Sequence, residues 1–241
     1  MTLRNRAMLR KLLPCVVLAF AFTCPLMPDH FPGTHWLQYK TPEDAGFSSQ
    51  KLEKARKLAE HYKSASVLII YKGAIVQSWG DASRRFRMHS ARKATQSALI
   101  GIYTSKGQID INKTIGEYGI DEITLLTDVE KRATVEQLLT GYSGIYLPSV
   151  AGNNGGPKRG AYKPGEHWYY NNWDYNALNS VFEQQTHVKL TDAFVENIAR
   201  PIGMEDFAPH DAWYNYEKIS MHPVYHMNMS SRDMARFGCC I

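Results

Sequence analysis

The sequence has few cysteines, and their spacing suits neither a disulfide framework nor a metal site. Of the four cysteines in 241 residues, Cys15 and Cys24 lie in an apolar N-terminal stretch, and Cys239 and Cys240 are neighbours near the C-terminus. This spacing excludes a small disulfide-stapled domain and a zinc site built from spaced cysteine pairs. The fold must therefore depend on a hydrophobic core, for which a content of 44% hydrophobic residues is sufficient.

The chain also lacks a clustered basic face. Its formal net charge is +5, but four of these charges lie in residues 1–28, which contain no acidic residue. They are carried by Arg4, Arg6, Arg10 and Lys11. Because nucleic-acid binding needs clustered positive charge, the remainder of the chain predicts no nucleic-acid partner.

No apolar run is long enough to span a bilayer comfortably. The basic stretch MTLRNRAMLRK is followed by the short apolar stretch LLPCVVLAFAF, which Pro14 interrupts. This pattern is typical of an export signal. It predicts that residues 1–29 are either a cleaved signal peptide or a membrane anchor, with lipidation at Cys24 as a third alternative. Residues 30–241 are then a domain exported to the periplasm or held outside the cytoplasm by the anchor.

Motifs for metals and phosphates are missing too. There is no His-Glu-x-x-His, and Pro223 lies between His222 and His226, which argues against a helical metal pair. The glycine-rich segment 151–165 follows no predicted strand and has no Gly-Lys-Ser/Thr, so it indicates a surface loop. The sequence therefore predicts neither a metal nor a cofactor.

Hydrophobic periodicity predicts helices interrupted by one hairpin. Residues 66–81 read as two strands around a turn at Lys72-Gly73. Helical patterns cover 41–63, 90–105, 134–145, 173–186, 190–204 and 230–238. Thr134 is the predicted cap of the third helix, and Thr191 or Asp192 that of the fifth. This order indicates a sheet layered with helices and a helical insertion.

The segment HSARKATQSALIG places Ser90 and Lys93 one helical turn apart. Either Ser90 is a helix cap beside a solvated lysine, or it is a nucleophile beside its base. A second Ser-x-x-Lys at 48–51 is explained as the cap of a charged, amphipathic helix. Ser90 differs because apolar residues suited to burial follow it: Ala91, Ala94, Ala98, Leu99 and Ile102. A lysine beside a buried face is partly desolvated, which lowers its pKa and makes it a better base.

A second polar motif occurs in KPGEHWYYNNWDYNALN. Tyr-x-Asn is present twice, as Tyr169 with Asn171 and as Tyr170 with Asn172. A tyrosine beside an amine base can carry protons, and an asparagine can orient the lysine or bind a substrate amide. The alternative is an aromatic loop packed on the core.

These motifs together resemble the serine β-lactamase and penicillin-binding-protein superfamily, in particular its class C-like branch of esterases, D-amino-acid peptidases and amide-oligomer hydrolases. The resemblance rests on five segments in the expected order, covering most of the chain from about residue 41. They are FRMHSARKATQSALIGIYTSKGQI, EQLLTGYSGI, PGEHWYYNN, ARPIGMEDF and SSRDMARFG. It implies an α+β fold of the β-lactamase/transpeptidase type, with an antiparallel sheet flanked by helices and a helical insertion domain.

The resemblance also implies roles for four residues. Ser90 matches the acylated nucleophile and Lys93 its general base. Tyr170 matches the motif tyrosine, because the family places it six residues after the proline at position 164, and Asn172 is its substrate-positioning partner. The implied activity is hydrolysis of esters, small amides or D-amino-acid peptides through an acyl-enzyme, with β-lactams as a further candidate.

In this superfamily a third motif, further strands and a C-terminal helix follow the segment that ends this chain. We therefore expect a chain truncated at its C-terminus, without those strands and without the second oxyanion donor. The alternative function is an inactive penicillin-binding-like domain that binds a small ligand or a short peptide without turnover.

Overall fold

The computed structural model describes residues 31–152 and 155–240. Its first sheet is a hairpin of β1 (Ser66–Tyr71) and β2 (Ala74–Gly80), paired antiparallel. The two turn residues, Lys72 and Gly73, both have positive φ angles, of 47° and 77°. Such a turn matches the twist of the flanking strands, so the predicted hairpin is confirmed.

A second antiparallel sheet has the strand order β3-β5-β4. Its strands are β3 (Arg85–Arg87), β4 (Ala212–Asn215) and β5 (Val224–Ser230). The sequence patterns did not predict these strands. β5 is buried along almost its whole length, although polar and apolar residues alternate from His226 to Ser230.

The N-terminal helical segment is two elements. A 3₁₀ turn at Pro42–Ala45 ends at Gly46, whose φ of 77° is left-handed, and α1 (Ser49–His61) begins after it. The prediction of one helix over 41–63 was therefore wrong, because Gly46 terminates the first turn. Ser48 caps α1 by accepting from the amide of Lys51, as expected for this copy of Ser-x-x-Lys.

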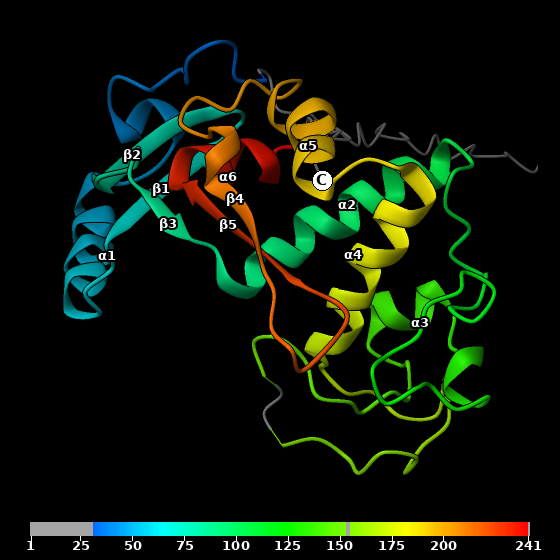
Figure 1. The fold of residues 1–241 in the computed structure, drawn as a ribbon. Helices are drawn as coiled ribbons and strands as arrows, with labels where there is room; N and C mark the ends of the chain where they lie inside the picture. Colours follow the sequence, from blue (N-terminus) through cyan, green and yellow to red (C-terminus); the bar gives the residue numbers. More distant parts are fainter. Residues whose placement is uncertain (1–30, 153–154, 241) are drawn as a thin grey trace, which may run out of the picture.

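The core lies between α2 (Arg92–Ser105) and α4 (Asn172–Thr186), which cross the centre of the molecule (Figure 1). Leu99 of α2 and Phe182 of α4 are fully buried, and the ring of Tyr103 lies edge-on to Phe182. The short helix α3 (Val135–Thr140) packs against α4, and Thr134 and Gln137 form a capping box at its start.

The next helix, α5 (Leu190–Phe194), continues into a π-turn at Val195–Ala199. Neither Thr191 nor Asp192 caps it, so that prediction was wrong. The helix begins earlier, because Leu190 is buried and its amide donates to Glu183 Oε1 at 3.2 Å. The last helix, α6 (Ser231–Gly238), is capped by Ser230, which accepts from the amide of Asp233.

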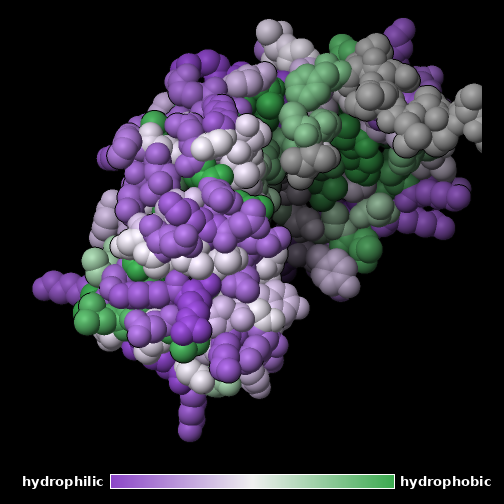
Figure 2. Space-filling model, turned by 90° about the vertical axis from the view of Figure 1, so that its right-hand side faces the viewer, coloured by the Kyte–Doolittle hydropathy of each residue, from purple (hydrophilic) through white to green (hydrophobic). Residues whose placement is uncertain are grey.

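The predicted α+β fold, with antiparallel sheets flanked by helices, is confirmed (Figure 1). Figure 2 shows one face on which apolar side chains gather toward the upper right and hydrophilic ones cover most of the rest. The predicted signal or anchor at 1–29 lies outside the described residues. Within the described ranges, no helix is both long and apolar enough to cross a membrane.

Candidate active site

Ser90 lies in a tight turn directly before α2. The turn, His89–Ala91, is a 3₁₀ turn, and the residue that enters it, His89, has a φ of 46°. Hydrogen bonds to neighbouring elements hold the turn in place: Arg92 Nη1 donates to the His89 carbonyl at 2.8 Å, and the Met88 amide donates to the Met227 carbonyl on β5 at 2.9 Å. A strained backbone persists only where its surroundings fix it, so the position of Ser90 is well determined.

Lys93 lies in the first turn of α2 and is only 7% exposed. Its Nζ donates to Tyr170 Oη at 2.5 Å and to Asn172 Oδ1 at 2.7 Å. Burial disfavours the ammonium form, so the pKa of Lys93 is lowered from its ordinary value. The structure thus brings together three of the four residues predicted from the sequence.

The fourth, Ser90, joins the group through Tyr170. Burial alone would raise the pKa of Tyr170, but hydrogen bonds with Lys93 and Ser90 and the charges of Lys93 and Arg92 lower it overall. In the described part of the chain, Ser90 makes no direct hydrogen bond to Lys93. Ser90 therefore affects this group through the phenol of Tyr170, whose pKa it lowers.

The adjacent asparagines Asn171 and Asn172 have different surroundings. Asn171 is buried, accepts from the Trp173 amide at 3.1 Å and so caps α4. Asn172 accepts from Lys93 and donates through Nδ2 to the Gly152 carbonyl at 2.8 Å. This contrast decides between the two Tyr-x-Asn copies, because only the second one reaches the lysine.

The expected burial of α2 is partly wrong. Ala91 and Ala94 are exposed, whereas Thr95 and Gln96 are buried. Thr95 Oγ1 is 3.1 Å from the Tyr225 hydroxyl, and Gln96 Nε2 donates to the Tyr175 carbonyl at 2.8 Å. The face of α2 that carries Lys93 thus packs on α4 and β5 through polar contacts. Lys93 is buried by these contacts and not by the predicted alanines.

Ser90 opens into a hollow of about 250 Å³. Its other lining residues are Arg87, His89, Arg92, Ala151, Asn172 and His226. Burial and the neighbouring charges of Arg87, Arg92 and His89 lower the pKa of His226 to about 4, so this imidazole is neutral at pH 7. The hollow places a serine hydroxyl, an amide and two guanidinium groups around one open space.

The family model described as Beta-lactamase matches residues 50–238 of the chain, which include Ser90, Lys93, Tyr170 and Asn172. The chain belongs to the β-lactamase family. This is the serine β-lactamase and penicillin-binding-protein superfamily that the motifs resemble. No curated protein matches the chain.

Solved structures of this superfamily share the fold. The chain is similar to a putative 6-aminohexanoate-dimer hydrolase from Bacillus anthracis, with a TM-score of 0.60 and 20% identity over 76% of this chain and 55% of that one. A penicillin-binding protein homologue from Pyrococcus abyssi gives a TM-score of 0.59 and 19% identity over 80% and 56%. A class C β-lactamase gives 0.52 and 17% over 76% and 61%. The chain thus spans about half to three-fifths of the length of these relatives.

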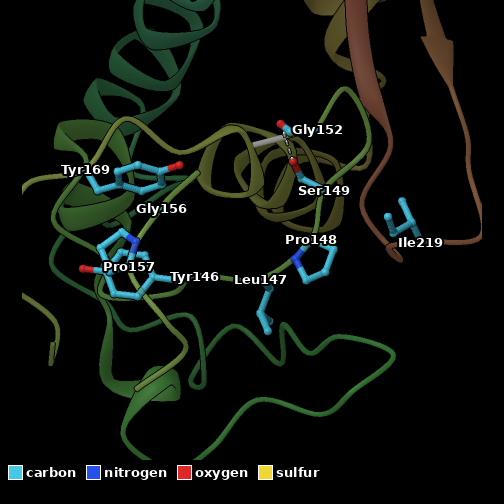
Figure 3. Close-up of a pocket in the computed structure, with 9 residues that line it drawn as sticks. All are labelled: Tyr146, Leu147, Pro148, Ser149, Gly152, Gly156, Pro157, Tyr169 and Ile219. Carbon is cyan, nitrogen blue, oxygen red and sulfur yellow. Dashed lines mark hydrogen bonds between the residues drawn. The ribbon is translucent and has the colours of Figure 1, made fainter. Parts of the chain in front are cut away.

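A second hollow, of about 310 Å³, is lined by Gly152, whose carbonyl accepts from Asn172 of the first hollow (Figure 3 shows the residues that line the second hollow). Tyr146 and Tyr169 line one side, and Ile219 faces them from the connection between β4 and β5. Tyr169 is the tyrosine of the first Tyr-x-Asn copy, and its ring lies 5.7 Å from that of Tyr146. That copy therefore belongs to an aromatic wall beside the β-lactamase-family site.

The two histidines weighed as metal ligands do not form a pair. His222 Nδ1 lies 2.8 Å from Ser180 Oγ and its Nε2 lies 2.9 Å from the Asp121 carbonyl, whereas His226 lines the hollow of Ser90. Among the residues that the structure describes, no group of His, Cys, Asp or Glu is arranged to hold a metal ion. The contribution of Arg87 and His226 to the site was not predicted, because β3 and β5 were not recognised as strands.

Proposed function

We propose that this chain carries the site of a serine hydrolase that forms an acyl-enzyme. Its substrates would be esters, small amides or D-amino-acid peptides, with β-lactams as a further candidate. One observation carries the proposal: the buried Lys93 donates hydrogen bonds to Tyr170 and Asn172 one helical turn from Ser90, and Ser90 interacts with Tyr170 strongly enough to lower the pKa of its phenol. Such an arrangement is what activation of a weak serine nucleophile requires.

In the first step Ser90 Oγ attacks the substrate carbonyl carbon while its proton moves to the Tyr170 oxygen. Tyr170 is the proposed acceptor because it is hydrogen-bonded to Lys93 and because its interaction with Ser90 lowers the pKa of its phenol. Lys93 favours the phenolate by its charge and hydrogen bond, and Asn172 orients the lysine. The sequence-based role of Lys93 as the base is thus shared with Tyr170.

The tetrahedral intermediate collapses when the bond to the leaving oxygen or nitrogen breaks, and Tyr170 returns the proton to that atom. Water then attacks the acyl-serine with the same tyrosine as base, which releases the acid and restores Ser90. The backbone amide of Ser90, in the turn directly before α2, is the proposed first oxyanion donor, assisted by the positive end of that helix.

Two relatives support the amide and β-lactam part of this range. One is described as a putative hydrolase of the 6-aminohexanoate dimer and another as a class C β-lactamase. Both descriptions concern compounds with an amide or β-lactam bond. Residues 1–29 complete the proposal as a signal peptide or membrane anchor that exports the domain, so that small molecules or short peptides outside the cytoplasm are its substrates.

The test is covalent labelling of the full chain with a fluorophosphonate, followed by intact mass measurement. We expect one adduct on the wild type and none on Ser90→Ala. Ser48→Ala is the matched control, because Ser48 belongs to the second Ser-x-x-Lys and only caps α1. A folded wild-type protein that forms no adduct would contradict the enzyme proposal and favour a domain that binds its ligand without turnover.

A further inference from the structure

Lys93 meets an aromatic ring that none of the site motifs includes. Its Nζ lies over the ring of Tyr175, 4.9 Å from the ring centroid. Tyr175 is in the first turns of α4, on the apolar face that packs against the core, and its side chain is half-buried. Hydrophobic periodicity alone would therefore assign it to the core. The contact with the lysine amine makes it part of the site as well.

The position of the Tyr175 ring is fixed by hydrogen bonds at both ends of the residue. Its Oη donates to the Leu139 carbonyl of α3 at 3.1 Å, and its own carbonyl accepts from Gln96 Nε2 at 2.8 Å. Gln96 is buried and lies one helical turn after Lys93 on α2. The helix that carries the lysine thus also holds the residue whose ring the lysine meets. A rotation of the ring away from Nζ would break the bond to Leu139.

The hydroxyl of Tyr175 takes no part in proton transfer. It is engaged with Leu139, and burial together with the charges of Tyr170 and Asp174 raises the pKa of Tyr175, so that its phenol stays neutral. What Tyr175 presents to the amine is the face of its ring, which carries partial negative charge. Such a face stabilises an ammonium group, and does so more strongly where water is excluded.

Burial and nearby charges act in opposite directions on Lys93. Burial and the neighbouring guanidinium of Arg92 favour the neutral amine, whereas the hydrogen bond and charge of Tyr170 favour the ammonium. In the part of the chain that the structure describes, no carboxylate forms an ion pair with Lys93. The ring of Tyr175 therefore joins Tyr170 in favouring the charged form. Two groups from other elements, neither of them acidic, face the adjoining hollow: Arg87 of β3 and His226 of β5.

From these contacts we infer that Tyr175 is a positioning residue, whose ring face keeps Lys93 charged and beside the Tyr170 oxygen. A charged Lys93 stabilises the Tyr170 phenolate, which is the proposed acceptor of the Ser90 proton. Without the ring, the lysine would lose its proton more readily, and the phenol would keep its own and could not accept another. The effect on rate rests on the proposed function, whereas the charge of Lys93 can be measured without turnover.

The test measures the charge of Lys93 directly in the full chain. NMR of isotope-labelled lysine side chains follows the Cε resonance of Lys93 against pH in Ser90→Ala, and its absence from Lys93→Arg assigns it. We expect Tyr175→Leu to move the midpoint of this titration down by about one pH unit, because a desolvated ammonium loses its aromatic contact. Tyr175→Phe keeps the ring face and should leave the midpoint unchanged.

Phe182→Leu is the matched control for the loss of a ring from the same helix. Phe182 is fully buried and packs against Tyr103 in the core. This variant should lose stability in urea unfolding and leave the midpoint of Lys93 unchanged. A Tyr175 that only fills space would behave in the same way, so an unchanged midpoint in Tyr175→Leu would overturn the inference. Equal shifts in Tyr175→Phe and Tyr175→Leu would also overturn it, because they would assign the effect to the hydroxyl.

Ester hydrolysis by the chain with Ser90 intact separates this inference from the proposed function. For 4-nitrophenyl acetate, Tyr175→Leu should lower kcat by about tenfold and change KM by less than about twofold, because Tyr175 does not line the hollow of Ser90. An unchanged kcat in an active enzyme would contradict the positioning role. If the wild type hydrolyses no ester but Tyr175→Leu still lowers the midpoint of Lys93, the ring contact stands and the enzyme proposal fails.

Discussion

The phenolic oxygen of Tyr170 lies 2.5 Å from Nζ of Lys93, although 77 residues separate them in the chain. The start of α2 supplies the lysine, and the segment that leads into α4 supplies the tyrosine. Because the two groups share a hydrogen bond in a partly buried site, the loss of a proton from one changes the affinity of the other. They act as one titrating pair, and two of the predictions below depend on this coupling.

Replacing the Tyr170 hydroxyl should remove the proton carrier and leave the aromatic ring in place. We expect Tyr170→Phe to lower kcat for 4-nitrophenyl acetate by about 10²- to 10³-fold, which is the usual range for loss of an acid-base group. Stopped-flow measurement of 4-nitrophenol release gives the rate. Tyr169→Phe is the matched control, because Tyr169 belongs to the aromatic wall of the second hollow. Equal losses in both variants would contradict the role of Tyr170.

The pH profile should show an acid limb. Acylation needs the Tyr170–Lys93 pair in its form with one proton removed, and burial of Lys93 and the contacts around Tyr170 lower the pKa of both groups. The rate should therefore rise with pH, with a midpoint below the ordinary tyrosine value of about 10. A plot of kcat/KM against pH from 5 to 10 measures this midpoint. A rate that falls over the same range would contradict the assignment.

A pair of lysine variants distinguishes a base from a fixed charge. If Lys93 acts mainly by favouring the Tyr170 phenolate, Lys93→Arg keeps the positive charge and should retain about tenfold more activity than Lys93→Met. If Lys93 itself accepts the proton, both variants should lose activity equally, because arginine stays protonated. Circular dichroism of both variants checks that they fold.

Asp174 should make stability depend on pH. It is 0% exposed, and burial raises its pKa well above the ordinary aspartate value, although Ser143 and Asn171 act in the opposite direction. Its contribution to stability is complete below the unfolded-state pKa of about 4 and is lost as pH rises through the folded-state pKa. Asp174→Asn should therefore gain stability relative to the wild type between pH 5 and pH 9. Urea unfolding at both pH values measures this, and the exposed Asp192→Asn should show no such change.

Glu122 should behave in the opposite way. Burial alone would raise its pKa, but hydrogen bonds from Ser220, Trp173 and the amides of Ile123 and Met221 lower it overall. Its stabilising contribution is present above the unfolded-state pKa and is lost as pH falls through the folded-state pKa. Glu122→Gln should cost about 1–3 kcal/mol at pH 7, because one donor loses its acceptor, and less at pH 4.

Urea unfolding at the two pH values measures this cost. The exposed Glu136→Gln is the matched control and should change stability little at either pH. A cost for Glu122→Gln that grows toward pH 4 would have the wrong sign.

Local signals in the sequence predicted much of the fold. The hairpin at 66–81 was predictable because Lys72-Gly73 favours a tight turn, and α3 because Thr134 and Gln137 form a capping box. The meeting of Lys93, Tyr170 and Asn172 was predicted from family motifs, and the structure places these side chains in contact. Their catalytic roles stay predictions.

What was not predicted depends on long-range contacts. β5 was missed although polar and apolar residues alternate from His226 to Ser230, and β3, which pairs with it, is only three residues long. The cap of α5 was assigned wrongly because Glu183, seven residues before Leu190, supplies the acceptor that a local cap would otherwise provide. No spacing rule indicates that Lys93 donates to Tyr170 and Asn172 rather than to Ser90, since these contacts depend on how α2 and α4 pack.

The side-chain amide of Asn172 links the lysine to a loop. Its oxygen accepts from Lys93, and its nitrogen donates to the carbonyl of Gly152, which also borders the second hollow. The planar amide of Asn172 therefore fixes two distances at once, one from its oxygen to Nζ of Lys93 and one from its nitrogen to the carbonyl of Gly152. A molecule that displaces Gly152 would rotate the Asn172 amide and so move the oxygen that accepts from Lys93. Binding of a molecule in the second hollow and the orientation of Lys93 are in this way coupled.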